Sequence, residues 1–478
     1  MSKIKKNFFY ISAYNLLTMI LPLIVSPILS RRLGAESLGI YTYVDSVVSI
    51  FVAFASTGVY RFGMREIAKV RDNKDELSQT FIDIWFNNAC NVLTVILIYL
   101  IFVFSVISEY KIYFLIRTGA FLVCLFDTAF LYCGLENMKQ VTIRDAIAKG
   151  LTFVLVITFI RSTDDLIFYF VIMTGGTLFG VVAGFLYGRK YIELKKPCIK
   201  NCIRLYKPMV ILLIPVLSSN IYHSMDKIMI GYFGVAEDVG YYELASKALI
   251  PRTIINAFGT AMCPHLTALY SSGKKKEADR KFHNTFMVSL VMSYAFMFGI
   301  CAIAKEFAPV FWGEGFEKCS SLMIGLSISI PIWAVGEVIR SQYLLPNSRD
   351  NEYSKTFVAG MIVNAVFNIL LIPSGGAFGA IVATLMAETS MSTYQIFLIK
   401  KEIAIMKYIV KSAPYFISGI IMVVIVRFMA NRFLFVSIYG LFLEVMAGGM
   451  SFVMMIILYE VLSKKRFLIS FLSEQCRR

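Results

Sequence analysis

Charged residues stand inside, or at the ends of, the long apolar stretches of this 478-residue sequence, and nine of them are candidates for a functional site. In a stretch that crosses a membrane, each buried charge costs about 2.5–3.5 kcal/mol, so such positions point to function. The cations could hold an anionic substrate, and the carboxylates could carry a coupling proton or line a polar cavity. The candidates are the cations Arg31, Arg32, Lys227, Lys247 and Arg252 and the acids Asp45, Asp226, Glu243 and Glu388.

Several of these charges also have a structural explanation. Glu243 and Lys247 are four residues apart, so they could neutralise each other on one helix face. Arg31 and Arg32 could extend to the outer lipid headgroups. Glu388 is either a coupling acid or a hydrogen-bonded structural acid. These alternatives remain open from the sequence alone.

Two further patterns depend on helix geometry. Arg252 lies about 180° from Glu243 on an ideal helix, so the two can share a face only if Pro251 bends the helix. A separate row of polar side chains repeats every four residues and fits interhelical hydrogen bonding as well as it fits a functional role. This row consists of Asp83, Asn87 and Asn91.

Four apolar stretches carry polar side chains at helical spacing, which predicts a polar face on each. Together these faces predict a water-accessible cavity between two halves of the chain. The stripes are Ser12, Asn15, Pro22 and Ser26; Thr42, Asp45, Ser49 and Ser56; Ser219, His223, Asp226 and Lys227; and Glu243, Ser246 and Lys247.

The composition requires these stretches to lie in a membrane. Hydrophobic residues make up 58% of the sequence and charged residues 16%, and the mean hydropathy is +0.70. A hydrocarbon core of about 30 Å needs about 20 helical residues per crossing. We therefore predict an all-α polytopic protein of about fourteen spans, at residues 7–30, 38–60, 80–107, 111–133, 140–161, 164–188, 208–232, 240–265, 282–304, 319–340, 355–373, 376–399, 408–430 and 433–462.

The distribution of cations gives the orientation. Most of the 47 Lys and Arg residues fall in alternate connections, among them 61–78, 134–149, 189–207 and 340–355. Cytoplasmic loops are enriched in Lys and Arg, so these connections and both termini are expected in the cytoplasm. The net charge of +16 then reflects topology and contact with anionic lipid, and it gives no reason to expect nucleic-acid binding.

Two turns about 200 residues apart resemble each other. Leu33–Tyr41 joins the first two predicted spans, and Phe233–Tyr241 joins the seventh and eighth with similar glycine spacing. A repeated six-span unit is typical of transporters built from two halves. We therefore expect a six-helix lobe at 1–205, a parallel repeat at 206–405, and a further helix pair with a basic cytoplasmic tail at 406–478.

The sequence contains no motif for several kinds of chemistry. It has no G-x-x-x-x-G-K-[ST] phosphate loop and no G-x-S-x-G nucleophile turn. Cys198 and Cys202 stand four apart without a second pair of metal ligands nearby. We therefore expect no catalytic residues, no metal site and no cofactor.

The chain resembles the polysaccharide-biosynthesis flippases, the Wzx-type branch of the multidrug/oligosaccharidyl-lipid/polysaccharide exporter superfamily. The resemblance spans essentially the whole length. It rests on Arg32-Leu33-Gly34 running to Gly39-Ile40-Tyr41, Gly63-Met64-Arg65-Glu66-Ile67-Ala68, Gly134-Leu135-Glu136-Asn137-Met138-Lys139, Asp226-Lys227-Ile228-Met229-Ile230-Gly231, and Asn364 with Asn368 before Leu371-Ile372-Pro373.

The resemblance implies two six-helix lobes around a central cavity lined by spans one, two, seven and eight. It also implies a function: moving undecaprenyl-pyrophosphate-linked oligosaccharides to the outer leaflet of the bacterial inner membrane for O-antigen, capsule or similar polymers. A polysaccharide polymerase and other assembly proteins would be its partners. The alternatives are a cation-coupled multidrug exporter of the same superfamily and an integral-membrane polymerase or ligase, although an enzyme of that class would be expected to present a large outside loop.

Overall fold

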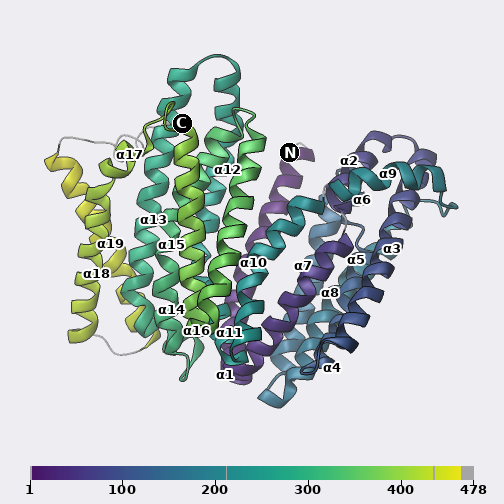
Figure 1. Cartoon of the computed structure of the whole chain (residues 1–478), viewed down its shortest axis with the longest axis horizontal. Helices are drawn as coiled ribbons and strands as arrows, with labels where there is room; N and C mark the ends of the chain where they lie inside the picture. Colours follow the sequence, from purple (N-terminus) through teal and green to yellow (C-terminus); the bar gives the residue numbers. More distant parts are fainter. Residues whose placement is uncertain (1–2, 57, 212, 434–436, 464–478) are drawn as a thin grey trace. The chain divides into compact units, whose positions relative to one another are not determined.

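The computed structural model describes the backbone of residues 3–56, 58–211, 213–433 and 437–463, and every regular element in these ranges is helical (Figure 1). It describes no side-chain surroundings for residues 3–20, 433 and several positions between 211 and 219. The predicted polar positions Ser12, Asn15 and Ser219 and the basic tail at 464–478 therefore lie outside the described part.

The chain forms two compact units, Met1–Gly240 and Tyr241–Arg478, which are called unit 1 and unit 2 below. Helix α10 packs along α1, and this packing places α10 in unit 1. The predicted division into lobes at residues 205 and 405 stays a prediction. The helices that lie wholly in unit 1 are α1 (Lys3–Ser56), α2 (Val59–Val70), α3 (Lys74–Ser105), α4 (Lys111–Arg117), α5 (Gly119–Phe126), α6 (Ala129–Gly134), α7 (Met138–Phe159), α8 (Leu166–Gly188), α9 (Ile199–Ile211) and α10 (Leu213–Phe233).

Helix α11 (Ala236–Ser246) joins the two units, and the remaining helices belong to unit 2. A 3₁₀ turn, η2 (Lys247–Leu249), follows α11, and a π turn, η3 (Arg340–Leu344), follows α15. The helices of unit 2 are α12 (Pro251–Ser271), α13 (Lys275–Trp312), α14 (Lys318–Ser327), α15 (Ser329–Ile339), α16 (Asp350–Ile399), α17 (Ile405–Lys411), α18 (Ala413–Phe433) and α19 (Ile438–Leu462).

Glycines at positive φ break the two longest helices. Helix α1 changes direction at Gly34 (φ 73°), and α16 changes direction at Gly376 (φ 51°). Residues with a Cβ rarely adopt this region of backbone space, whereas glycine enters it at little cost. Each long helix therefore provides two separate arms, close to the pairs of spans predicted at 7–30 and 38–60 and at 355–373 and 376–399.

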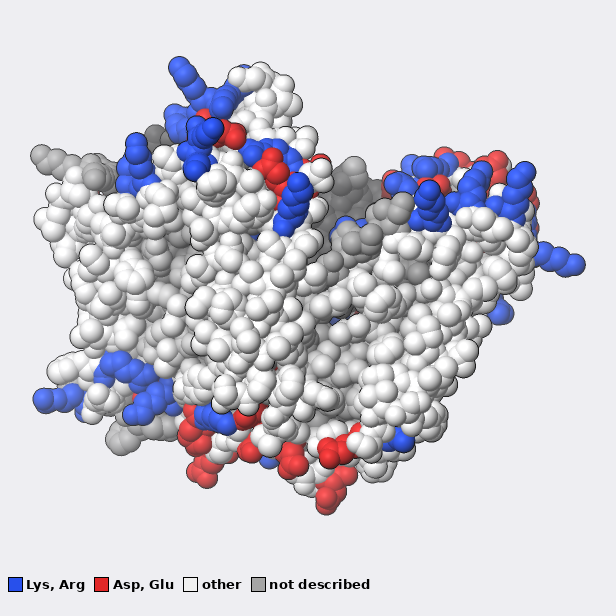
Figure 2. Space-filling view, in the orientation of Figure 1, with Lys and Arg blue, Asp and Glu red and all other residues white. Residues whose placement is uncertain are grey.

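The helices have the length and surface of membrane spans. Among the described residues, nine helical stretches are long and apolar enough to cross a membrane, and two of them contain the glycine breaks. Figure 2 shows that a surface largely without Lys, Arg, Asp or Glu separates the charged ends of each unit. The predicted all-α polytopic fold is confirmed, and the count of fourteen spans is compatible with these helices.

Helix α3 shows how one span is built. Asn73 caps its first turn by accepting hydrogen bonds from the backbone N–H groups of Asp75 (3.0 Å) and Glu76 (3.4 Å). Large apolar side chains at its far end are exposed, which is the surface that lipid covers. These side chains are Leu93, Leu97, Ile98, Ile101 and Phe104.

Candidate functional site

The second arm of α1 and helix α10 run antiparallel in unit 1, as two contacts along them and one just beyond the end of α10 show. Beyond that end, a Cβ on Gly39 would lie 1.7 Å from the carbonyl oxygen of Ala236, the first residue of α11. Further along, Gly231 lies against the ring of Tyr43. Near the other end, the hydroxyl oxygens of Ser49 and Ser224 are 2.9 Å apart. We call this pair of helices the α1–α10 ladder.

Three of the predicted site residues fall within one segment of the α1–α10 ladder. Asp45 lies between Tyr43 and Ser49 on α1, and Asp226 and Lys227 lie between Ser224 and Gly231 on α10. The three charges therefore stand at about the same level of the two helices. Asp226 is buried, and Lys227 is half-buried.

Asp45 has a partner from outside the ladder. The Arg117 guanidinium of α4 donates a hydrogen bond to the Asp45 carboxylate, and its Nη1 donates to the hydroxyl of Thr174 on α8 at 3.1 Å. Only 14% of the Arg117 side chain is exposed, against 40% of the Asp45 side chain. One guanidinium thus joins α1, α4 and α8.

The Arg117–Asp45 pair lines a cavity of about 290 Å³ within unit 1. The polar groups of its wall are an ion pair and hydroxyls, and the rest of the wall is mainly apolar. Because the cation and the carboxylate balance each other, the cavity suits water or neutral hydroxyl groups better than an additional net charge. Its polar lining consists of Asp45, Ser49, Arg117, Thr174 and Thr177.

The two similar turns found in the sequence contact each other at their glycines. A Cβ on Gly39 would meet the Ala236 carbonyl, and a Cβ on Gly240 would lie 2.0 Å from the carbonyl oxygen of Ala35. The contact is reciprocal, since each turn offers a glycine to the backbone of the other. The two turns whose similarity predicted the repeat thus lie against each other, and the repeat itself stays a prediction.

Arg31 and Arg32 lie away from these charges, beside the break at Gly34. Nη1 of Arg32 donates to the carbonyl oxygens of Ile157 (2.5 Å) and Ile160 (2.6 Å). These carbonyls are at the C-terminal end of α7, where a helix leaves acceptors unsatisfied and attracts a cation. Arg32 therefore joins α1 to α7, and Arg31 is exposed beside it.

In unit 2, two more predicted site residues contact each other. Nη1 of Arg252 donates to a carboxylate oxygen of Glu388 at 3.1 Å, and Nη2 donates to the hydroxyl of Ser329. The guanidinium also lies 5.2 Å from the ring centre of Trp333. Glu388 thus accepts a hydrogen bond inside unit 2, in accord with the structural alternative for this acid.

The helix between Glu243 and Arg252 is interrupted. Helix α11 ends at Ser246, the 3₁₀ turn η2 includes Lys247, and α12 begins at Pro251. The 3₁₀ turn lies just before Pro251 and changes the angle per residue, so ideal α-helix angles do not relate Glu243 to Arg252. Whether Pro251 bends the helix enough to bring them to one face stays a prediction. Lys247 and Glu243 are both half-buried.

Two arginines of the predicted cytoplasmic segments 134–149 and 340–355 are buried. Arg144 lies within α7 and Arg340 within η3, and only 10% and 3% of their side chains are exposed. Arg144 pairs with the neighbouring Asp145 at 2.7 Å, and Arg340 pairs with Glu337 at 2.9 Å. An acid one or three residues away was the available sequence signal, because a buried arginine needs such a partner.

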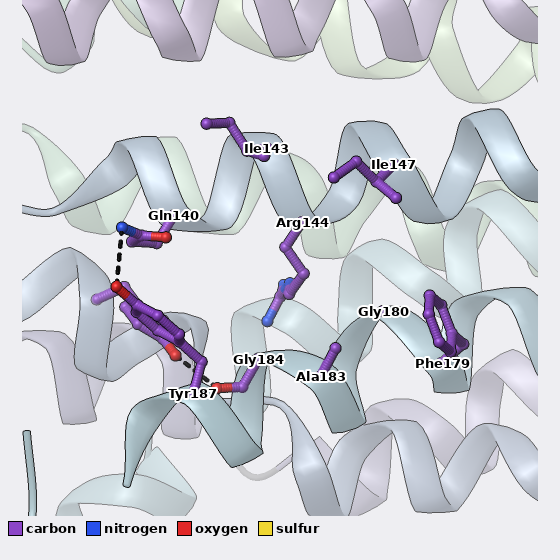
Figure 3. Close-up of a pocket in the computed structure, with 10 residues that line it drawn as sticks. Gln140, Ile143, Arg144, Ile147, Phe179, Gly180, Ala183, Gly184 and Tyr187 are labelled. Carbon is purple, nitrogen blue, oxygen red and sulfur yellow. Dashed lines mark hydrogen bonds between the residues drawn. The ribbon is translucent and has the colours of Figure 1, made fainter. Parts of the chain in front are cut away.

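Arg144 lies at a pocket of about 300 Å³ between α7 and α8 (Figure 3). Gly184 permits this position, since a Cβ there would lie 2.6 Å from Nη1 of Arg144. At one end of the pocket, the Gln140 amide donates to the Tyr187 hydroxyl at 3.4 Å. Most of the remaining lining is apolar, so the pocket offers few polar contacts around a guanidinium already held by Asp145.

Comparisons with known proteins match the chain to one family and to individual relatives. The profile of a family described as polysaccharide biosynthesis protein matches residues 4–269, which is more than half of the chain. A probable low-salt glycan biosynthesis flippase of Haloferax volcanii is 26% identical over 210 residues, which cover 43% of this chain and 44% of that protein. A putative O-antigen transporter of Escherichia coli K12 is 20% identical over 405 residues, or 83% of this chain and 97% of the relative.

Among solved structures, a lipid II flippase in an inward closed conformation has the same fold. The superposition gives a TM-score of 0.77 and covers 96% of this chain and 100% of that one. The sequences are only 14% identical. The structural likeness therefore shows the fold alone.

Proposed function

The chain belongs to the polysaccharide biosynthesis protein family, and on this premise we propose that it is a flippase for lipid-linked oligosaccharides. The observation that carries this proposal is the level shared by Asp45, Asp226 and Lys227 in the α1–α10 ladder. Charges at membrane depth are costly, and a polar substrate that crosses the bilayer gives them a use. The chain is accordingly a transporter and not an enzyme.

We propose an undecaprenyl-pyrophosphate-linked oligosaccharide as the substrate. A pyrophosphate cannot cross hydrocarbon without compensating positive charge and water. The proposed cations are Lys227 and Lys247, with Arg252 and the Arg31–Arg32 pair as further candidates. Asp45, Asp226, Glu243 and Glu388 would provide polar or coupling groups beside them.

The proposed mechanism is alternating access by movement of lobe 1–205 against lobe 206–405, around a central cavity lined by spans one, two, seven and eight. The α1–α10 ladder joins a helix of the first predicted lobe to a helix of the second. If the lobes must move apart, the Ser49–Ser224 contact must open during transport. The helix pair after residue 405 would then hold part of the lipid tail.

A disulfide between α1 and α10 tests this movement. The hydroxyl oxygens of Ser49 and Ser224 are close enough for a S49C/S224C pair to form a bond. Oxidation should stop flipping, and a reductant should restore it. Wild type and S49C alone, treated in the same way, control for the native cysteines. Undiminished flipping by the cross-linked protein would exclude this movement.

The proposed setting is the bacterial inner membrane, with both termini in the cytoplasm. Multiple apolar helices and the O-antigen transporter relative support this location. A polysaccharide polymerase is the expected neighbour in the membrane. Labelling of added terminal cysteines in intact and in opened cells would measure the orientation.

The substrate is tested by flipping in proteoliposomes that contain an undecaprenyl-pyrophosphate-linked oligosaccharide. Wild type should flip it, and Lys227→Ala and Lys247→Ala should each slow flipping at least tenfold at equal insertion. Lys190→Ala, which removes an exposed cation, should leave flipping unchanged. Activity that survives both substitutions would reject the proposed cations. An inactive wild type that exports drugs from whole cells would reject the substrate.

A further inference from the structure

Helix α9 exposes an apolar stripe beside a row of cations. Ile199, Ile203 and Tyr206 recur at helical spacing and are 59%, 71% and 43% exposed. Each is followed directly by a cation, so the cations form a second row about 100° around the helix. These cations, all exposed, are Lys200, Arg204 and Lys207.

The opposite side of α9 is fixed to α3. Cys202 and Met209 are buried there. Asp83 accepts hydrogen bonds from the backbone N–H of Cys198 at 2.7 Å and from the Asn201 amide at 3.2 Å, and Asn87 donates to the Cys202 carbonyl at 2.8 Å. The anchored face determines which residues point outward, and Figure 1 shows α9 lying across the end of unit 1.

These anchors place α9 near the edge of the membrane. Helix α3 has 32 residues and is therefore about 48 Å long, whereas the hydrocarbon core is about 30 Å thick. The exposed large apolar side chains of α3 run from Leu93 to Phe104, at the end of the helix away from α9. About ten residues at the start of α3 therefore extend beyond the hydrocarbon. Asp83 and Asn87 lie close to that boundary, at headgroup level.

A solvated cytoplasmic surface explains this stripe poorly. Exposed isoleucines on successive turns would keep apolar area in water, which is unfavourable. Lys195, just before α9, pairs with Asp75, but no ion pair of Lys200, Arg204 or Lys207 is found in the described part of the chain. The three cations thus remain available to another anion.

We propose that α9 is a lipid-binding helix whose Ile199–Ile203–Tyr206 stripe enters the cytoplasmic leaflet while Lys200, Arg204 and Lys207 bind the phosphates of anionic phospholipids. Amphipathic helices with this division of residues lie in the plane of the interface. The proposal rests on the predicted cytoplasmic orientation and is independent of the transported substrate.

Fluorescence of the full-length protein in nanodiscs tests the depth of the stripe. The I203W variant adds one indole to the three tryptophans of the chain, and the wild-type signal is subtracted. The added indole should emit at shorter wavelength than an indole in water and be quenched by brominated lipid. A Y206W variant provides a second probe if I203W does not fold. Water-like emission without quenching from both probes would overturn the proposal.

Lipid charge is tested with brominated phosphatidylglycerol against brominated phosphatidylcholine at equal mole fraction. Each cation should strengthen binding to the anionic lipid about fivefold relative to phosphatidylcholine. In the wild-type background, brominated phosphatidylglycerol should therefore quench the added indole more than brominated phosphatidylcholine, and K200Q/R204Q/K207Q should lose most of this difference. The control variant K274Q/K275Q/K276Q removes three exposed cations that follow Ser271, Ser272 and Gly273, and it should retain the difference in quenching between the two lipids. Equal loss in both triple variants would reject a specific role for α9. Loss of the preference on adding inorganic phosphate would assign the cations to a soluble anion and reject the lipid.

Discussion

Arg117 of α4 donates a hydrogen bond to Asp45 of α1 inside unit 1. The same guanidinium donates a hydrogen bond to Thr174 of α8. One side chain therefore links α4 and α8 to α1, the helix that carries the proposed site residues Arg31, Arg32 and Asp45. The pair therefore determines the charge of the cavity and the position of the α1–α10 ladder together.

Substituting Arg117 or Asp45 singly should distinguish the effect of the pair on stability from its effect on the charge of the cavity. Arg117→Gln leaves a carboxylate without its cation and should lower the free energy of unfolding by about 3 kcal/mol. Asp45→Asn should cost less, because Asp45 is more exposed. Thermal unfolding in detergent measures both, and flipping is then compared at equal folded concentration. If D45N/R117Q is as unstable as the sum of the two single variants, the pair makes no coupled contribution.

Adding a methyl group at Gly39 or Gly240 should disrupt the reciprocal turn contact. The obstructing atoms are backbone carbonyl oxygens, which cannot move like the end of a flexible side chain. Overpacking costs about 1–3 kcal/mol or more, so G39A and G240A should each lower the unfolding temperature by several degrees. Gly150→Ala is the matched control, since a Cβ there meets nothing within 4 Å. Stability equal to that of G150A would contradict the contact.

Arg252 and Glu388 distinguish a substrate site from a structural pair. If Arg252 acts only through Glu388, then R252Q and E388Q should lower stability by similar amounts and leave the substrate concentration for half-maximal flipping unchanged. If Arg252 also binds pyrophosphate, R252Q alone should raise that concentration, by about tenfold for a lost charge-assisted contact. We expect the second result, and a dose-response series in proteoliposomes measures it.

The membrane potential should drive the proposed reaction. A potential that is negative on the cytoplasmic side favours outward movement of an anion by about 2.3 kcal/mol per charge per 100 mV. Imposing such a potential with a potassium gradient and valinomycin should speed outward flipping, and reversing the gradient should slow it. Identical rates under both gradients would show that the rate-limiting step moves no net charge.

Much of the fold follows from the sequence because membrane spans are long and apolar. Helices α3, α7 and α8 lie within a few residues of the predicted spans, apart from the six residues by which α3 extends beyond its span at Lys74. The sequence predicted connections near Gly34 and Gly376, but not that a single glycine with non-helical backbone angles would separate the two arms in each case. Such details depend on local backbone angles and not on hydropathy.

The site was harder to predict than the fold. Helical spacing grouped Asp226 with Lys227, but which charges face each other depends on packing between distant segments. Arg252 and Glu388 are 136 residues apart, and Arg117 and Asp45 are 72 apart. The burial of Arg144 and Arg340 was not predicted either, because hydropathy cannot distinguish a buried, paired arginine from one in a connection.

The reciprocity of Gly39 and Gly240 also bears on ancestry. A contact in which two copies of one turn present the same residue to each other has the symmetry of a two-fold dimer. A half-length ancestor with a single turn would have formed it between two identical chains, and one glycine would have served both sides. Duplication and fusion would then turn that self-association into an internal contact. The two glycines could mutate separately from then on, but a Cβ at either position would still meet a backbone carbonyl of the other turn.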